Sequence, residues 1–130
     1  MKKNRIILSL AVVLWLTSSV SAATIDRIAV RSEAMKKEIP VVVIVPDAAK
    51  SGVRMPVLYL LHGYSGDQET WLNVKPSLPQ MADRDSVIVV CPDGENSWYW
   101  DSPKDPSSRF ETFVARELID YVDAHYPTRG

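Results

Sequence analysis

The stretch that decides the fold reads Met55-Pro56-Val57-Leu58-Tyr59-Leu60-Leu61-His62-Gly63-Tyr64-Ser65-Gly66. Its apolar part does not alternate with polar residues, so it predicts a strand over residues 55–61 that is covered on both faces, as in parallel sheets. A glycine-bearing turn after such a strand is where open α/β sheets bind ligands, since glycine lets backbone N–H groups point into the crevice. The alternative is a tight turn in which Gly63 and Gly66 supply positive φ angles and His62 packs beneath them.

Three further segments predict strands on either side of this stretch. Residues 41–45 are consecutive β-branched side chains closed by Pro46, and residues 86–91 form a similar run closed by Pro92. Residues 25–31 alternate apolar and polar side chains only loosely and give a weaker signal.

Two segments predict helices. Residues 76–83 carry apolar side chains at the i, i+3, i+4 spacing of a short helix. A longer helix is predicted over residues 109–125, capped by Ser107 or Ser108 and ended by Pro127. Its apolar stripe consists of Phe110, Phe113, Val114, Leu118, Tyr121, Val122 and His125. Strands that alternate with helices predict an α/β fold with a mostly parallel sheet and flanking helices.

Residues 1–22 have the organisation of a signal peptide. A basic start is followed by an apolar run over residues 6–16, and Val20-Ser21-Ala22 fits a cleavage site. The run is shorter than the ~20 residues that a membrane-spanning helix needs. A buried N-terminal helix or an uncleaved anchor is the alternative. Cleavage would leave residues 23–130 with no membrane span, 12 basic and 16 acidic residues and a net charge of −4. We therefore expect a secreted or periplasmic protein.

Composition excludes several classes of protein. Apolar residues make up 46% and charged residues 24% of the 130 residues, a balance typical of a globular protein. The net charge of −1 offers no basic excess to neutralise phosphates, so we expect no nucleic-acid partner. The single cysteine, Cys91, excludes an internal disulfide. Only His62 and His125 accompany it as strong metal ligands, and no ligand-like spacing occurs. We expect no metal site and no cofactor.

The order of several motifs resembles one family. The segment strand-His-Gly-aromatic-x-Gly is similar to the oxyanion loop of α/β-hydrolases. The wider pattern resembles the Putative esterase family, which includes S-formylglutathione hydrolases (esterase D), tributyrin esterases, feruloyl and acetyl-xylan esterases, and mycolyltransferases. The resemblance covers roughly residues 38–128. The motifs that carry it are 60–66, Trp71-Leu72, Pro92-Asp93-Gly94, Ser97-Trp98-Tyr99, 110–113 and 117–122.

The resemblance implies roles for residues of two loops. In such esterases the residue after His-Gly, here Tyr64, donates its backbone N–H to the oxyanion of the tetrahedral intermediate, together with the residue after the nucleophilic serine. His62, Gly63 and Gly66 would be structural members of this turn. The substrate side would be lined by Asn96, Ser97, Trp98 and Tyr99. The implied substrate is a small-molecule or polysaccharide-linked ester. The alternative for the aromatic cluster Trp98-Tyr99-Trp100 is that this loop packs against the edge of the sheet.

The sequence departs from the family in one respect. No serine of residues 1–130 stands in a Gly-x-Ser-x-Gly nucleophile elbow, and in this fold the acid and histidine of the triad follow the serine. We therefore expect an α/β-hydrolase-type sheet truncated before the nucleophile elbow. Residues 23–130 would be the N-terminal portion of the domain, an oxyanion-hole half that is inactive alone.

Two hypotheses that assign the chain a function other than ester hydrolysis stay open. One is a non-catalytic carbohydrate-binding or interaction module that uses Trp98, Tyr99 and Trp100 as a stacking platform. The other is an inactive truncated gene product. Truncation would also leave the strand over residues 55–61 with an unpaired edge, which predicts self-association of the fragment.

Overall fold

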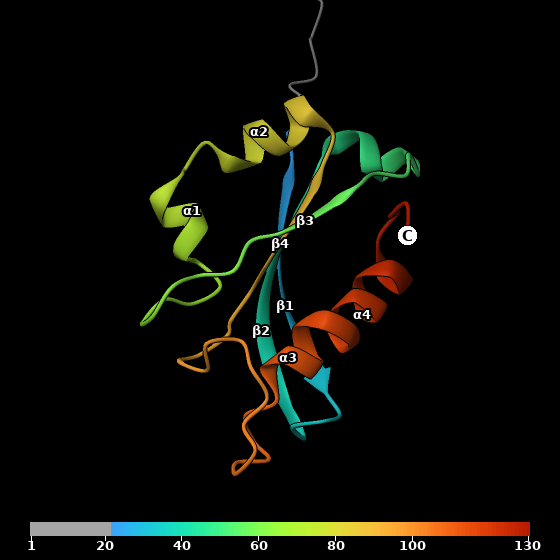
Figure 1. The fold of residues 1–130 in the computed structure, drawn as a ribbon. Helices are drawn as coiled ribbons and strands as arrows, with labels where there is room; N and C mark the ends of the chain where they lie inside the picture. Colours follow the sequence, from blue (N-terminus) through green and yellow to red (C-terminus); the bar gives the residue numbers. More distant parts are fainter. Residues whose placement is uncertain (1–21) are drawn as a thin grey trace, which may run out of the picture.

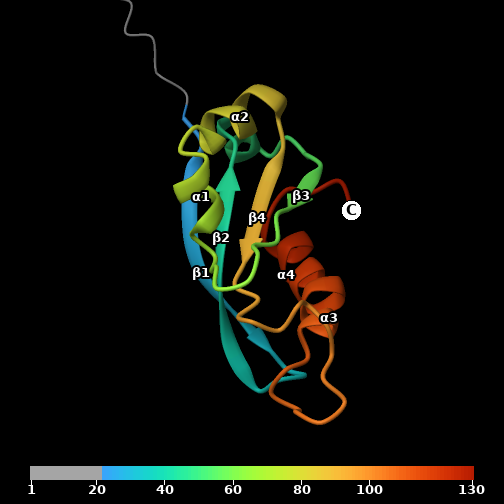
Figure 2. The ribbon, with the colours of Figure 1, turned by 60° about the vertical axis from the view of Figure 1, so that its left-hand side comes forward.

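The computed structural model describes residues 22–130, so residues 1–21 of the predicted signal peptide lie outside the described residues. No helix within residues 22–130 is long and apolar enough to cross a membrane. The described chain forms a single sheet with helices on both of its faces (Figures 1 and 2).

The sheet has four strands in the order β1-β2-β4-β3. They are β1 (Thr24–Ser32), β2 (Lys37–Val45), β3 (Val57–Tyr59) and β4 (Ile88–Pro92). The prediction of a mostly parallel sheet is wrong for these strands, because β1–β2 and β2–β4 pair antiparallel and only β3–β4 pair parallel. A short turn over residues 33–36 joins β1 to β2 and forces a hairpin, whereas helices connect β3 to β4 and allow both strands to run the same way.

The strand predicted over residues 55–61 is much shorter in the structure. Pro56 has no N–H to donate, and Met55 pairs with Thr128 on the side of β3 that faces away from β4. The backbone of Met55 accepts from Arg129 N–H (3.0 Å), and its own N–H donates to Pro127 O (2.9 Å). The ladder to β4 persists one residue past β3, where Leu60 N–H donates to Val90 O (2.9 Å).

The two faces of the sheet carry separate cores. One core lies beneath α1 (Thr70–Val74) and α2 (Leu78–Asp85) and joins these helices to alternate residues of β2 and β4. The other packs β1 and the remaining β2 positions against α3 (Phe110–Thr112), a π-helical turn (Phe113–Glu117) and α4 (Leu118–His125). A 3-10 turn, Asp47–Ser51, precedes β3. Because β2 is covered on both faces, its consecutive β-branched residues are all buried.

The long C-terminal helix agrees with its predicted extent but not with its predicted cap. Neither Ser107 nor Ser108 caps it. Asp101 instead accepts hydrogen bonds from the Thr112 N–H (3.0 Å) and hydroxyl (2.5 Å). His125 is exposed, outside the apolar stripe, and its ring stacks on Tyr121 at 3.9 Å.

Candidate functional site

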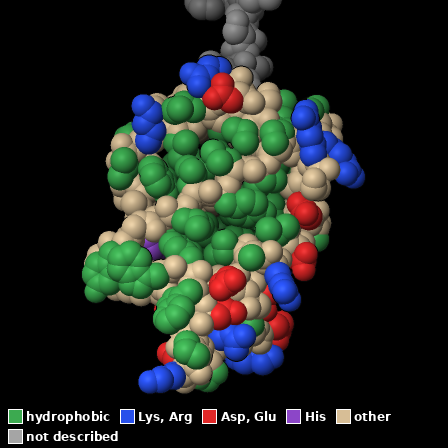
Figure 3. All heavy atoms as spheres, in the orientation of Figure 1, with side chains coloured by type: hydrophobic (Ala, Val, Ile, Leu, Met, Phe, Trp, Pro, Cys, Tyr) green, Lys and Arg blue, Asp and Glu red, His purple; other side chains and the backbone are tan. Residues whose placement is uncertain are grey.

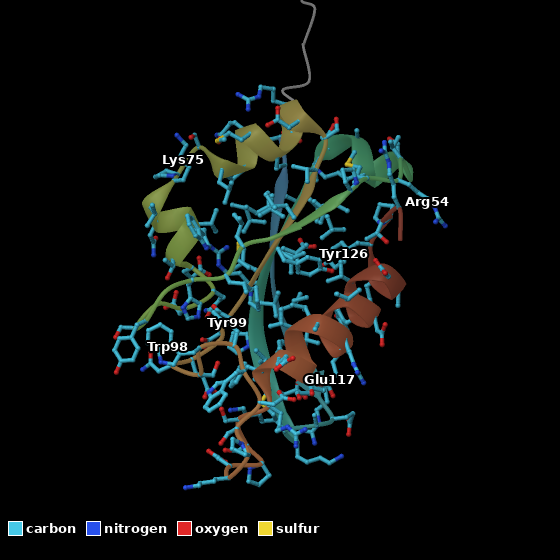
Figure 4. All side chains as sticks on the ribbon, in the orientation of Figure 1. Arg54, Lys75, Trp98, Tyr99, Glu117 and Tyr126 are labelled. Carbon is cyan, nitrogen blue, oxygen red and sulfur yellow. The ribbon has the colours of Figure 1, made fainter. Side chains whose placement is uncertain are left out.

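Two loops meet where β3 and β4 end. Because these strands are parallel neighbours, their carboxyl ends lie at the same edge of the sheet, and the loops that follow them are brought together. Between them lies a pocket of about 130 Å³. It is lined by His62, Gly63, Tyr64, Glu95, Asn96, Trp98 and Tyr99. Figure 4 labels Trp98 and Tyr99.

His62 joins the two loops through its buried ring. Its Nδ1 lies 2.7 Å from Gly63 O, and its Nε2 accepts from the backbone N–H of Gly94 (2.9 Å). The second bond makes Nε2 the acceptor and therefore assigns the ring proton to Nδ1. With both ring nitrogens engaged, the His62 ring holds the loops together and is not placed to take a proton from a substrate.

Tyr99 reaches the same turn from the opposite side. Its hydroxyl accepts from the His62 backbone N–H (2.9 Å) and donates to His62 O (3.2 Å). Burial, with smaller contributions from Asp93 and Cys91, raises the pKa of Tyr99 to about 12. The hydroxyl therefore keeps its proton at neutral pH and makes both hydrogen bonds.

The turn leaves two backbone donors free. Ser65 N–H donates to Asn96 Oδ1 (2.9 Å), and Gly66 N–H donates to Gly63 O (3.1 Å). The N–H groups of Gly63 and Tyr64 donate to no acceptor within residues 22–130. Since both residues line the pocket, the turn can offer N–H donors to a ligand oxygen.

Glycine acts in this site through close approach and not through positive φ. Gly63 and Gly66 both have negative φ; the left-handed residue of the turn is Ser65, with φ of 62°. A Cβ on Gly66 would stand 2.8 Å from His62 Nδ1 and from Thr70 Oγ1, so only glycine fits there. The alternative in which these glycines supply positive φ angles is therefore wrong.

Strained backbone is concentrated around the pocket. Six non-glycine residues of the described chain have positive φ, and four of them, Ser65, Glu95, Trp98 and Tyr99, belong to these two loops. Such conformations cost free energy and persist only where the surroundings impose them, which is typical of binding and catalytic sites.

The aromatic residues of the second loop point in different directions. Trp98 is 77% exposed and stacks on Tyr64 with ring centroids 6.0 Å apart, whereas Tyr99 turns inward (Figure 4). Trp100 does not line the pocket. The three residues therefore do not form one stacking platform, because the left-handed backbone of Trp98 and Tyr99 separates their side chains.

Ser97 lies elsewhere than its sequence-based assignment to the substrate side. It is buried, and its hydroxyl donates to Gly94 O (2.5 Å) and accepts from Tyr99 N–H (3.1 Å). Sequence reasoning missed Glu95, which lines the pocket and pairs with Lys37 at 2.7 Å. Its place directly after Gly94 was the only available signal. Among the described residues, no group of three or more His, Cys, Asp or Glu side chains is placed to hold a metal ion.

The whole described site falls within a match to a known family. Residues 32–130 match the family described as Putative esterase. A curated acetyl esterase of Caldicellulosiruptor saccharolyticus is 36% identical over 73 residues, which are 56% of this chain and 27% of that protein.

Solved structures of serine hydrolases share the fold. Serine hydrolase F of Staphylococcus aureus aligns with a TM-score of 0.72 at 22% identity, over 82% of this chain and 42% of its own. An S-formylglutathione hydrolase of Agrobacterium tumefaciens gives 0.72 at 22%, over 84% and 48%. A ferulic acid esterase of Anaeromyces mucronatus gives 0.65 at 20%, over 85% and 46%.

The chain thus spans about a quarter of the acetyl esterase and less than half of each of these structures. Its fold is of the α/β-hydrolase type, with a mixed sheet and flanking helices. The match over residues 32–130 places the chain in the Putative esterase family.

Proposed function

We propose that residues 23–130 are the N-terminal portion of an exported serine carboxylic-ester hydrolase and supply its oxyanion turn. The observation that carries this proposal is the free N–H of Tyr64 at the pocket. Gly63 has the other free N–H of this turn, whereas those of His62, Ser65 and Gly66 donate to acceptors within the site. Two preorganised N–H donors at a developing oxyanion are the central catalytic feature of acyl-transfer enzymes.

The nucleophile would come from another part of the protein. In the complete enzyme a serine Oγ attacks the ester carbonyl while a histidine takes its proton and passes it to the departing alcohol. The oxyanion of the tetrahedral intermediate accepts from Tyr64 N–H and from the N–H of the residue after the serine. Water then attacks the carbonyl of the acyl-enzyme while the histidine takes its proton and passes it to the departing serine Oγ, which releases the acid. This cycle needs no cofactor.

The position of the C-terminal segment supports this arrangement. After α4 the chain returns to β3 and pairs in parallel with Met55 through Thr128. A strand that continued this pairing would run beside β3 on its free edge and end next to the oxyanion turn. A serine has to lie there for the oxyanion of the tetrahedral intermediate to reach Tyr64 N–H.

The pocket favours an ester with a planar or small acyl group. Its rim carries the stacked rings of Tyr64 and Trp98, and its volume of about 130 Å³ suits a compact group. The matches include an acetyl esterase and a ferulic acid esterase. With export inferred from residues 1–22, polysaccharide-linked acyl esters are the proposed substrates.

The test compares the chain with a longer reading frame. Residues 1–130 alone should hydrolyse a chromogenic short-chain ester no faster than background, because no activated nucleophile is present. A frame that continues past codon 130 and encodes Gly-x-Ser-x-Gly should give an active enzyme that loses activity when this serine becomes alanine. A stop codon followed by unrelated sequence would favour a binding module or an inactive gene product. Turnover by the 130-residue chain that disappears in Ser65→Ala would overturn the mechanism.

A further inference from the structure

We propose that Tyr99 is a positioning residue of the oxyanion turn and not a substrate-binding residue. Its hydroxyl holds both polar atoms of the His62 peptide backbone and so fixes the direction of the Tyr64 N–H two residues later. This inference rests on the proposed function for its catalytic consequence, although the structural part stands on the described contacts alone.

Strand pairing is lost just before the turn. The last ladder hydrogen bond between β3 and β4 is the one from Leu60 N–H to Val90 O (2.9 Å). Beyond it, the backbone of His62 has no neighbouring strand within the described chain. The Tyr99 hydroxyl takes the place of that strand, since it accepts from His62 N–H (2.9 Å) and donates to His62 O (3.2 Å). The turn is thereby held beyond the end of the sheet.

The Tyr99 hydroxyl has only one proton to donate. A phenol has one O–H, and that of Tyr99 is directed at His62 O. The hydroxyl cannot also donate to a substrate carbonyl or sugar oxygen without giving up its hydrogen bond to His62 O. Tyr99 therefore offers the pocket only its ring, in contrast to the exposed Trp98.

The loop over residues 94–99 is built around the inward position of the Tyr99 ring. A Cβ on Gly94 would lie 2.2 Å from Tyr99 Cε1, so the ring requires glycine at this position. Ser97 Oγ accepts from Tyr99 N–H (3.1 Å), and the backbone of Tyr99 is left-handed, with φ of 55°. Gly94 also donates its N–H to the His62 ring (2.9 Å). The segment 94–99 thus holds His62 by its backbone and by its ring.

The test uses Tyr99→Phe, which removes the hydroxyl and keeps the ring. The matched control is Tyr126→Phe, because Tyr126 is also half-buried and its hydroxyl donates to Asp26 at 3.3 Å, away from the turn (Figure 4). Residue-resolved hydrogen exchange by NMR measures the His62 amide in both variants. Loss of its acceptor should speed exchange of this amide by about tenfold in Tyr99→Phe and leave it unchanged in Tyr126→Phe. Protected amides in β2 and β4 show that each variant is folded.

The catalytic arm uses the longer, nucleophile-bearing chain. Tyr99→Phe should lower kcat for a short acetyl ester by about tenfold, with KM within about twofold, because the turn is misplaced while the pocket keeps its ring. A raised KM with unchanged kcat would make Tyr99 a substrate contact and overturn the inference, as would an unchanged His62 exchange rate. An inactive longer chain would overturn the proposed function. The His62 exchange rate would still decide whether Tyr99 holds the turn.

Discussion

The carboxyl end of β3 and its outer edge differ in how far their backbone groups are hydrogen-bonded. At its carboxyl end, the turn over residues 62–66 is fixed by hydrogen bonds that join His62 to Tyr99 and to Gly94, and Ser65 to Asn96. Along its outer edge, only the bridge from Met55 to Thr128 forms, and β3 has no neighbouring strand on this edge within residues 22–130. The site is therefore complete in its local structure, whereas the sheet that carries it is open.

Exposed apolar surface also lies near the outer edge of β3. Leu58 is 46% exposed and Leu61 38% exposed, and Figure 3 shows hydrophobic side chains gathered over the middle of this face. A groove of about 280 Å³ between β3, α4 and the C-terminal segment is lined by Pro56, Val57, Tyr59, Ile119, Asp123, Arg129 and Gly130. Exposed apolar surface beside unpaired backbone groups favours pairing with another strand. Preorganisation of the turn therefore does not depend on a strand beside the outer edge of β3.

The largest expected effect comes from removing the Tyr64 N–H donor from the turn at the carboxyl end of β3. In the longer, nucleophile-bearing chain, Tyr64→Pro should lower kcat by roughly 10²–10³, because proline has no N–H to offer the oxyanion. Tyr64→Phe keeps the N–H and should retain most of the activity. Ester-hydrolysis kinetics of the two variants decide the matter, and near-normal kcat in a folded Tyr64→Pro variant would remove Tyr64 from the oxyanion hole.

The next effect tests whether the second loop needs close approach at Gly94. Gly94→Ala places a methyl group where the ring of Tyr99 lies and should destabilise the fold by ~1–3 kcal/mol, the usual cost of overpacking. Gly63→Ala is the matched control for stability, since a Cβ there meets nothing within 4 Å. Urea unfolding followed by circular dichroism measures both. Equal stability of the two variants would show that the Tyr99 ring yields freely.

The open side predicts association of the chain. Residues 23–130 should elute from a size-exclusion column as oligomers through the free edge of β3, and Leu58→Lys should shift the elution toward the monomer. Val74→Lys makes the same charge change on a residue of α1 that is exposed but lies off this edge. A monodisperse, cooperatively melting monomer of the unsubstituted chain would contradict this prediction and favour a complete binding module.

The smallest effect is a loss of stability at alkaline pH, to which tyrosines at the turn and at the groove both contribute. Burial raises the pKa of Tyr99 at the turn and that of Tyr59 at the groove to about 12 each, with Asp123 adding to the effect on Tyr59. A tyrosine whose pKa is raised in the folded state makes its full contribution to stability below the unfolded-state pKa of about 10. This contribution is lost as pH rises from about 10 to 12. Urea midpoints measured from pH 8 to 12 should fall less steeply in Tyr99→Phe and in Tyr59→Phe. A slope that neither variant changes would assign the alkaline loss to other groups.

Much of the fold and part of the site follow from local features of the sequence. The β-branched run over residues 41–45 predicted a buried strand, and the apolar spacing over residues 109–125 predicted one long helix. His62-Gly63-Tyr64 and the motifs that follow predicted the esterase family, and residues 32–130 match that family. Asn96, Trp98 and Tyr99 do line the pocket beside this turn.

Only the tertiary structure decided how these elements face one another. It made two of the three strand pairings antiparallel, buried Ser97, turned Tyr99 toward His62 and brought Thr128 to Met55. Apolar spacing and turn residues report the surroundings of each residue along the chain, so they indicate where strands and helices lie, although not their exact ends. Pairing direction, and which of two aromatic neighbours points inward, depend on contacts between residues far apart in sequence, such as the 37 positions that separate His62 from Tyr99. Local sequence carries no signal for those contacts, because their free energy arises only once the loops have met.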